Sequence, residues 1–155
     1  YFDAWAHLGV LYIQAGRFTD AESALQKAAA LKSNNEIENH LGVAYLNQNK
    51  FSEAEAQFRK SIRLNGNFFL PHFNLGVVLQ HKRDFSAAEQ SYIRALSLNP
   101  EYIPALLNLA IVQTELGKKE QAADNLRRFI QQAPPQMQQQ IADARQRLAA
   151  LESEL

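Results

Sequence analysis

The side chains best suited to chemistry in this sequence are its four histidines, and their spacing argues against a metal site. His7 and His40 lie far apart along the chain, and His72 and His81 follow later. No HxxxH or HExxH pair is present, so no two imidazoles share one helical face at the spacing of a zinc site. The chain also has no cysteine, which excludes thiolate catalysis and zinc ribbons. We therefore expect no metal ion and no other cofactor.

Other catalytic arrangements lack the motifs that would position them. The sequence contains no G-x-S-x-G turn for a nucleophilic serine and no glycine-rich phosphate loop. Its carboxylates are expected to be scattered over solvent faces, with no apolar pocket to perturb a pair. We predict no catalytic residues, and hence that the chain is not an enzyme.

Length and charge limit the remaining classes of function. The 155 residues include 16 basic and 16 acidic side chains, so no basic excess favours nucleic acid as a partner. No window approaches the roughly 18 consecutive apolar residues of a membrane span. The chain opens at Tyr1 with no signal-like segment. This favours the cytoplasm, although the lack of cysteine identifies no compartment.

A Leu-Gly pair recurs along the chain at nearly constant spacing. It stands at Leu8, Leu41 and Leu75 and returns as Leu-Ala at Leu109. The period is about 34 residues, which predicts stacked repeats of one supersecondary unit. The spacing from Leu8 to Leu41 is one residue shorter than the two spacings that follow. This predicts that one residue is missing from the turn at 33–35.

The second half of each unit repeats as well. A small alanine is followed four residues later by a large side chain, in the pairs Ala21 and Leu25, Ala54 and Phe58, Ala88 and Tyr92, and Ala122 and Leu126. Apolar positions at i, i+3, i+4 and i+7 predict two helices per unit. Glycine inside a helix costs about 1 kcal/mol relative to alanine. We therefore expect Gly9, Gly42 and Gly76 to permit the close approach of two helix backbones.

The segment from Trp5 to Tyr12 reads W-x2-L-G-x2-Y, and with the features above it resembles the tetratricopeptide repeat. The resemblance implies an all-α, right-handed α-solenoid of four helix-turn-helix hairpins, at residues 2–34, 35–68, 69–102 and 103–134. The pattern departs from the family where Glu38, His72 and Leu106 replace the tryptophan and where Ala110 replaces the glycine.

Residues 135–155 follow a different pattern and are expected to form a C-terminal capping helix. After Pro134 and Pro135, one narrow apolar stripe runs along Met137, Ile141, Ala144, Leu148, Leu151 and Leu155. Such a helix would cover the exposed apolar edge of the last repeat. The stripe is also a heptad pattern, so pairing with the same helix of another copy is the alternative. The N-terminus shows no comparable cap, and we expect further repeats upstream in the parent protein.

The resemblance places the first helix of each unit on a concave groove. Amide and imidazole groups there could hydrogen-bond a peptide backbone, and the branched residues could bury apolar side chains. A core role for Val10, Val43, Val77 and Ile111 is the alternative. The candidate peptide-binding residues are His7, Val10, Asn39, His40, Val43, Asn47, Phe73, Asn74, Val77, His81, Leu107, Asn108 and Ile111.

Two more specific resemblances concern this groove. Asn74 and Asn108 resemble the asparagine ladder in the repeat domain of O-linked N-acetylglucosamine (O-GlcNAc) transferases. By contrast, the carboxylate clamp with which co-chaperone repeats bind acidic C-terminal tails is missing. The equivalent positions hold Ala6, Val10, His40, Leu70 and Asn74. We therefore expect no tight binding of acidic C-terminal peptides.

The sequence thus predicts a non-catalytic protein–protein interaction module whose groove binds an extended or helical peptide segment, apolar in part. One alternative is a homo-oligomeric assembly scaffold that uses the N-terminal edge or the C-terminal stripe. Another is the targeting or substrate-recruiting domain of a larger enzyme whose catalytic part lies outside this sequence. The partner in the first case is a protein or peptide, with neither nucleic acid nor a membrane span involved.

Overall fold

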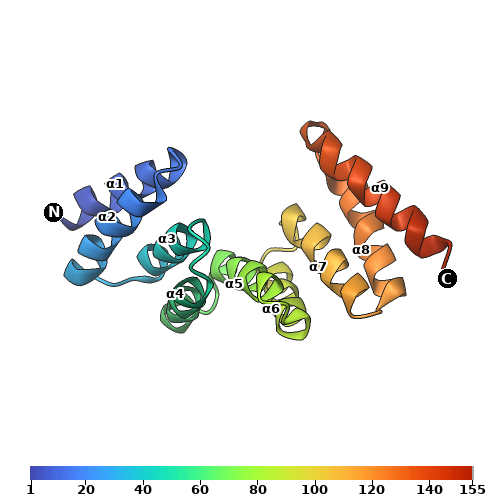
Figure 1. Ribbon diagram of the computed structural model, residues 1–155, viewed down its shortest axis with the longest axis horizontal. Helices are drawn as coiled ribbons and strands as arrows, with labels where there is room; N and C mark the ends of the chain where they lie inside the picture. Colours follow the sequence, from blue (N-terminus) through green and yellow to red (C-terminus); the bar gives the residue numbers. More distant parts are fainter. Residues whose placement is uncertain (155) are drawn as a thin grey trace.

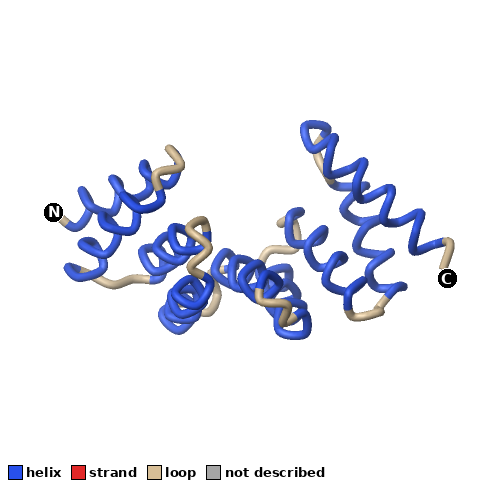
Figure 2. The backbone as a smooth tube through the Cα atoms, in the orientation of Figure 1, coloured by secondary structure: helices blue, strands red, loops and turns tan. Residues whose placement is uncertain are grey.

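The computed structural model describes residues 1–154, and this part of the chain is helical with no strand. Figure 1 shows helical hairpins that follow one another in a curved row, with the chain ends at opposite ends of the row. The hairpins are joined by short loops (Figure 2). Their helices are α1 (Phe2–Gln14) and α2 (Phe18–Leu31), α3 (Asn35–Leu46) and α4 (Phe51–Leu64), α5 (Phe69–His81) and α6 (Phe85–Leu98), and α7 (Ile103–Glu115) and α8 (Lys119–Gln132). The architecture confirms the predicted α-solenoid of hairpins.

The loop between the first two hairpins is one residue shorter than the next two. It spans residues 32–34, whereas the later loops span residues 65–68 and 99–102. This difference accounts for the short first step of the repeat. The loop still ends in a helix cap, because Oδ1 of Asn34 accepts a hydrogen bond from the backbone N–H of Ile37 at 2.8 Å.

The repeated glycines lie where a large side chain of the second helix crosses the first. A Cβ atom added to Gly42 would lie 2.5 Å from Cε1 of Phe58, and one added to Gly76 would lie 2.6 Å from Cε1 of Tyr92. Gly9 has the same relation to Leu25. The close approach expected from the sequence is therefore present, but it joins a helix backbone to a side chain rather than two backbones.

The turn inside each hairpin uses one residue with a positive φ angle. Gly16 and Gly117 hold this position in the first and last hairpins, at φ 71° and 73°. Asn49 and Arg83 hold it in the middle hairpins, at φ 58° and 62°. Glycine adopts this conformation without the steric penalty that arginine carries.

The hairpins stack so that their first helices form one face. The second helix of each hairpin packs on the first helix of the next, and α1, α3, α5 and α7 also contact one another in succession. Leu41, Leu75 and Leu109, from the repeated Leu-Gly positions, are buried in these interfaces. The concave face predicted for the first helices is therefore formed by α1, α3, α5 and α7 (Figure 1).

The chain closes with a 3-10 turn, η1 (Pro135–Met137), and α9 (Gln138–Glu152), which packs on α8. Ala144 and Leu151 are buried in a core shared with Leu126 and Phe129 of α8, and Met137, Ile141 and Leu148 pack against the same core. Leu155, the last residue of the predicted stripe, lies outside the described residues. Among the described residues, the stripe therefore packs on its own chain through Ala144 and Leu151, while Met137, Ile141 and Leu148 stay half-buried.

Candidate functional site

The first helices of the first two hairpins enclose a hollow on the concave face, which we call the first hollow. It has a volume of about 480 Å³ and lies between α1 and α3. Val10 and Ile37 line it beside two imidazoles, those of His7 and His40. These histidines occupy the same repeat position, and the stacking brings them to one surface.

A second hollow lies between α5 and α7, and it has a volume of about 630 Å³. Val77 and His81 line it from α5, and Asn108 and Ile111 line it from α7. The turn before α6 adds Arg83 to the lining. Seven of the thirteen predicted groove residues therefore line one of the two hollows, namely His7, Val10, His40, Val77, His81, Asn108 and Ile111.

Asn39 and Asn74, which line neither hollow, form a hydrogen-bonded pair between α3 and α5. Nδ2 of Asn74 donates to Oδ1 of Asn39 at 3.0 Å. Asn39 is only 3% exposed, whereas Asn74 is half-buried. Asn39 therefore orients Asn74 from below the surface and is itself not accessible to a ligand. Asn108 is held similarly, because its Nδ2 donates to the Tyr92 hydroxyl at 3.4 Å.

Three other predicted groove residues are engaged mainly in packing. Phe73 lies against the rings of Tyr102 and Tyr92, with centroids 5.0 and 5.7 Å away. Leu107 packs on the core beneath α8 and α9, and Val43 packs on the main core. All three remain half-buried rather than fully covered. Val10, Val43, Val77 and Ile111, which the sequence left open between groove and core, are all half-buried. Val43 and Val77 pack against the main core, and Val10, Val77 and Ile111 line one of the hollows.

The last predicted residue, Asn47, is exposed at the end of α3. Its Nδ2 donates to the backbone oxygen of Val43 at 2.9 Å, which holds it along its own helix. His81 of the second hollow is exposed too, and its ring stacks on Phe51 at a centroid distance of 5.0 Å.

The two histidines of the first hollow differ in environment. Burial lowers the pKa of His40, against the opposing charge of Glu36. His7 is exposed, and its Nδ1 lies 2.7 Å from the backbone oxygen of Asp3. Around neutral pH His40 therefore favours the uncharged ring, which can both donate and accept a hydrogen bond.

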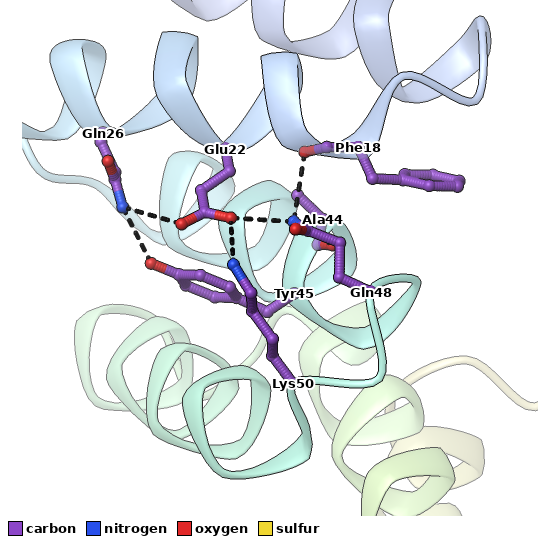
Figure 3. Close-up of polar contacts among 7 residues, drawn as sticks. All are labelled: Phe18, Glu22, Gln26, Ala44, Tyr45, Gln48 and Lys50. Carbon is purple, nitrogen blue, oxygen red and sulfur yellow. Dashed lines mark hydrogen bonds and ion pairs between the residues drawn. The ribbon is translucent and has the colours of Figure 1, made fainter.

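A repeated polar contact that the sequence reasoning missed joins each hairpin to the next. Figure 3 shows its first instance, in which Glu22 of α2 meets Lys50 and Gln48 of the following turn. Oε2 of Glu22 lies 2.8 Å from Nζ of Lys50 and accepts from Nε2 of Gln48 at 2.9 Å. Burial raises the pKa of Glu22, but the bonds from Lys50 and Gln48 outweigh it, so the pKa lies below its usual value.

A glutamate–lysine pair also joins the hairpins at the next two junctions, although Lys82 lies two residues earlier in its repeat than Lys50 and Lys118 do in theirs. Oε2 of Glu55 lies 2.6 Å from Nζ of Lys82, and Oε2 of Glu89 lies 2.6 Å from Nζ of Lys118. The three glutamates recur at the repeat period, which is the signal that could have revealed them. Glu89 is 3% exposed, so the expectation of carboxylates scattered over solvent faces was wrong for these positions.

Glu38 is a second buried carboxylate, at the position where the repeat pattern has tryptophan. It is fully buried, and its Oε1 accepts from Nζ of Lys60 at 2.7 Å and from Oγ of Ser33 at 2.6 Å. These partners belong to α4 and to the short first loop. Glu38 therefore stabilises the second hairpin internally and takes no part in the concave face.

Two further features of the described residues bear on function. Between Tyr1 and Glu154, no three His, Asp or Glu side chains gather into a group that could hold a metal ion. Across the same residues, no helix is long and apolar enough to cross a membrane.

The repeat pattern and the hairpin geometry are those of a known family. Family models described as tetratricopeptide repeat match residues 2–35, 40–101 and 104–135, so the chain belongs to the tetratricopeptide-repeat family. No curated protein is significantly similar to the chain in sequence.

Solved structures share the fold at low sequence identity. A crystal structure of MamA is 21% identical, with a TM-score of 0.79 over 84% of this chain and 77% of MamA. YrrB, described as a TPR protein with an unusual peptide-binding site, is 18% identical, with a TM-score of 0.79 over 94% of this chain and 74% of its own. PilF of Pseudomonas aeruginosa is 24% identical, with a TM-score of 0.80 over 92% of this chain and 67% of its own.

Proposed function

We propose that this chain is a non-catalytic protein-interaction module whose concave face binds a peptide segment, extended or helical and apolar in part. The observation that carries the proposal is the pair of hollows on the concave face. Each is lined by branched apolar residues, Val10 and Ile37 in the first and Val77 and Ile111 in the second, beside imidazole or amide groups. Apolar side chains of a ligand could bury there while the polar groups bond its backbone.

The chemistry of Asn74 and Asn108 supports this proposal. Each amide is oriented by one intramolecular hydrogen bond, which reduces the entropy lost when it bonds a ligand. Both also resemble the asparagine ladder of O-GlcNAc transferase repeats. The description of YrrB as a TPR protein with a peptide-binding site gives a precedent for this use of the fold.

The proposal is tested by placing a charge in the second hollow. We expect Val77→Glu to weaken the binding of displayed random peptides by about ten-fold or more, because a carboxylate in place of the valine must be desolvated when an apolar ligand side chain packs there. Binding is measured by fluorescence anisotropy with peptides selected on the unaltered protein.

The matched control is Ile93→Glu, the same kind of change at a 43% exposed residue of α6, outside both hollows. It is expected to leave binding unchanged. Circular dichroism and thermal melting confirm that both variants fold. Equal binding by Val77→Glu and the unaltered chain would contradict a concave binding face.

Assembly with a second copy is a second candidate function, favoured by one uncovered surface. Leu11 of α1 is 58% exposed, whereas Ala44, Val78 and Val112 at the same repeat position are completely buried by the preceding hairpin. The described part of the C-terminal stripe packs on α8, so this face of α1, which also contributes Leu11 to the first hollow, is the better candidate for such assembly.

The assembly candidate predicts a mass that rises with concentration in light scattering. Leu11→Glu, at an exposed position, should abolish that rise without unfolding the chain. A monomer at every concentration tested would reject this candidate and leave the peptide-binding proposal untouched.

A further inference from the structure

The concave face is divided into two halves of different chemistry. In the first two hairpins a carboxylate precedes a histidine by one helical turn, as Asp3 and His7 on α1 and as Glu36 and His40 on α3. At the same positions in the last two hairpins, an apolar residue precedes an asparagine, in the pairs Leu70 and Asn74, and Pro104 and Asn108. The half formed by α1 and α3 therefore carries charge that the other half lacks at these positions.

The carboxylates of the first hollow have no neutralising partner there. Asp3 and Glu36 both line the hollow, and no lysine or arginine is among its lining residues. Among residues 1–154 neither carboxylate forms an ion pair. A nearby cation, Lys32, lies over the ring of Phe2 with Nζ 5.8 Å from its centroid. The first hollow is thus negative at neutral pH.

The second hollow has no such imbalance. Glu115 is a carboxylate in its lining, and the guanidinium group of Arg83 lines the same hollow. Gln80 and Asn108 add neutral amides. Any preference for ligand charge should therefore come from the first hollow rather than from the concave face as a whole.

Apolar residues lie beside these carboxylates in the first hollow. Phe2, Val10 and Ile37 line it together with Asp3 and Glu36. An apolar side chain of a ligand can contact these apolar residues while a neighbouring cationic side chain approaches the carboxylates of Asp3 and Glu36. Long basic side chains suit this arrangement, because their methylene stems pack on apolar surface while their charge stays in water.

We propose that the first hollow selects peptide segments carrying lysine or arginine next to an apolar residue, while α5 and α7 hold a neutral part of the same segment. The inference rests on the proposed peptide-binding function and adds the charge of the ligand and its place on the groove. It also extends the expectation that acidic tails bind poorly. Without the carboxylate clamp the groove does not attract acidic tails, and the carboxylates of Asp3 and Glu36 repel them.

The test is selection of random displayed peptides on the purified chain at low salt. Peptides recovered on the unaltered protein should be enriched in lysine and arginine next to apolar residues, and depleted in aspartate and glutamate. The double variant Asp3→Asn with Glu36→Gln should lose this bias. For one selected basic peptide, it should lose about five-fold in affinity, the effect of two exposed charge pairs. Added salt should reduce that difference.

The matched control is Glu53→Gln with Glu120→Gln, which changes the net charge equally. These carboxylates lie in the first turns of α4 and α8, outside both hollows. This variant should keep the basic bias and the affinity. Peptides selected without a basic bias, or with a bias that survives Asp3→Asn with Glu36→Gln, overturn this inference and leave the proposed function standing. Selection that enriches no peptide at all overturns both.

Discussion

Each hairpin is held together at one point by a small residue facing a large one. In the second hairpin Gly42 lies against Phe58, and in the third Gly76 lies against Tyr92. In the first hairpin Gly9 lies against Leu25. In the fourth hairpin alanine stands at the glycine position, and Ala110 and Leu126 are buried in one core. In the first three hairpins the side chain of the second helix therefore occupies the space that a Cβ atom at the glycine position would need.

This pairing predicts that Gly42→Ala destabilises the chain although alanine is the better helix former. The added methyl group would lie within 2.9 Å of three Phe58 ring atoms. We expect a loss of about 1–3 kcal/mol in the free energy of unfolding, typical of overpacking. Adding Phe58→Leu should recover part of it, because leucine is smaller than phenylalanine and its flexible side chain can move away from the added methyl group. A Gly42→Ala variant more stable than the parent in urea unfolding would disprove the account.

The burial of His40 predicts a pH dependence of stability. Its pKa is lowered below 6.5 in the folded chain, so the unfolded chain binds a proton first as the pH falls. Stability should therefore decrease as the pH drops below about 6.5, the ordinary histidine value. His40→Gln should flatten this part of a melting-temperature profile. His72, whose pKa is lowered by burial as well, sets the remaining slope. A profile unchanged by His40→Gln contradicts the prediction.

At the level of helices, the repeated glutamate–lysine pairs fix each hairpin against the next. The first and third pairs use lysines at the same repeat position, Lys50 and Lys118. These two pairs differ in burial, because the side chain of Glu22 is 18% exposed and that of Glu89 is 3% exposed. Ala123 replaces the glutamate in the fourth hairpin, where α9 follows instead of another hairpin. The series of glutamate–lysine pairs therefore ends at the fourth hairpin, on which α9 packs.

This difference in burial predicts unequal effects from the same substitution. Lys118→Met should lower the free energy of unfolding by about 1–3 kcal/mol, because it leaves the buried Glu89 without its charged partner. Gln113 stays bonded to Glu89 and limits the loss. Lys50→Met should cost clearly less, because water can solvate Glu22. Equal losses for the two variants in urea unfolding would show that burial does not decide the strength of the pair.

At the scale of the molecule, the architecture could be predicted from the sequence because several positions of each unit recur with the same period. The spacing of Leu8, Leu41, Leu75 and Leu109 and the alanines of the second helices all indicate one unit. The stripe of the C-terminal helix follows ordinary helical periodicity, and it packs where a cap was expected. Features repeated along the chain and tied to apolar burial are therefore readable without a structure.

The details of the concave face were less predictable, because they depend on contacts between hairpins. Asn39 and Asn74 lie on different helices, and only stacking shows that one is buried to orient the other. The charge of the first hollow likewise arises when α1 and α3 bring Asp3 and Glu36 to one cavity. Neither residue was predicted to be part of the site, although the two occupy the same position in successive repeats.

The central claim is that ligands bind on the concave face formed by α1, α3, α5 and α7. The most direct measurement is titration of the isotopically labelled chain with a selected peptide, followed by backbone amide NMR spectra. We expect the shifted signals to come from the first helices, above all around His7, His40, Val77 and Asn108. Shifts concentrated instead on α2, α4 and α6, with the first helices unchanged, would contradict the claim.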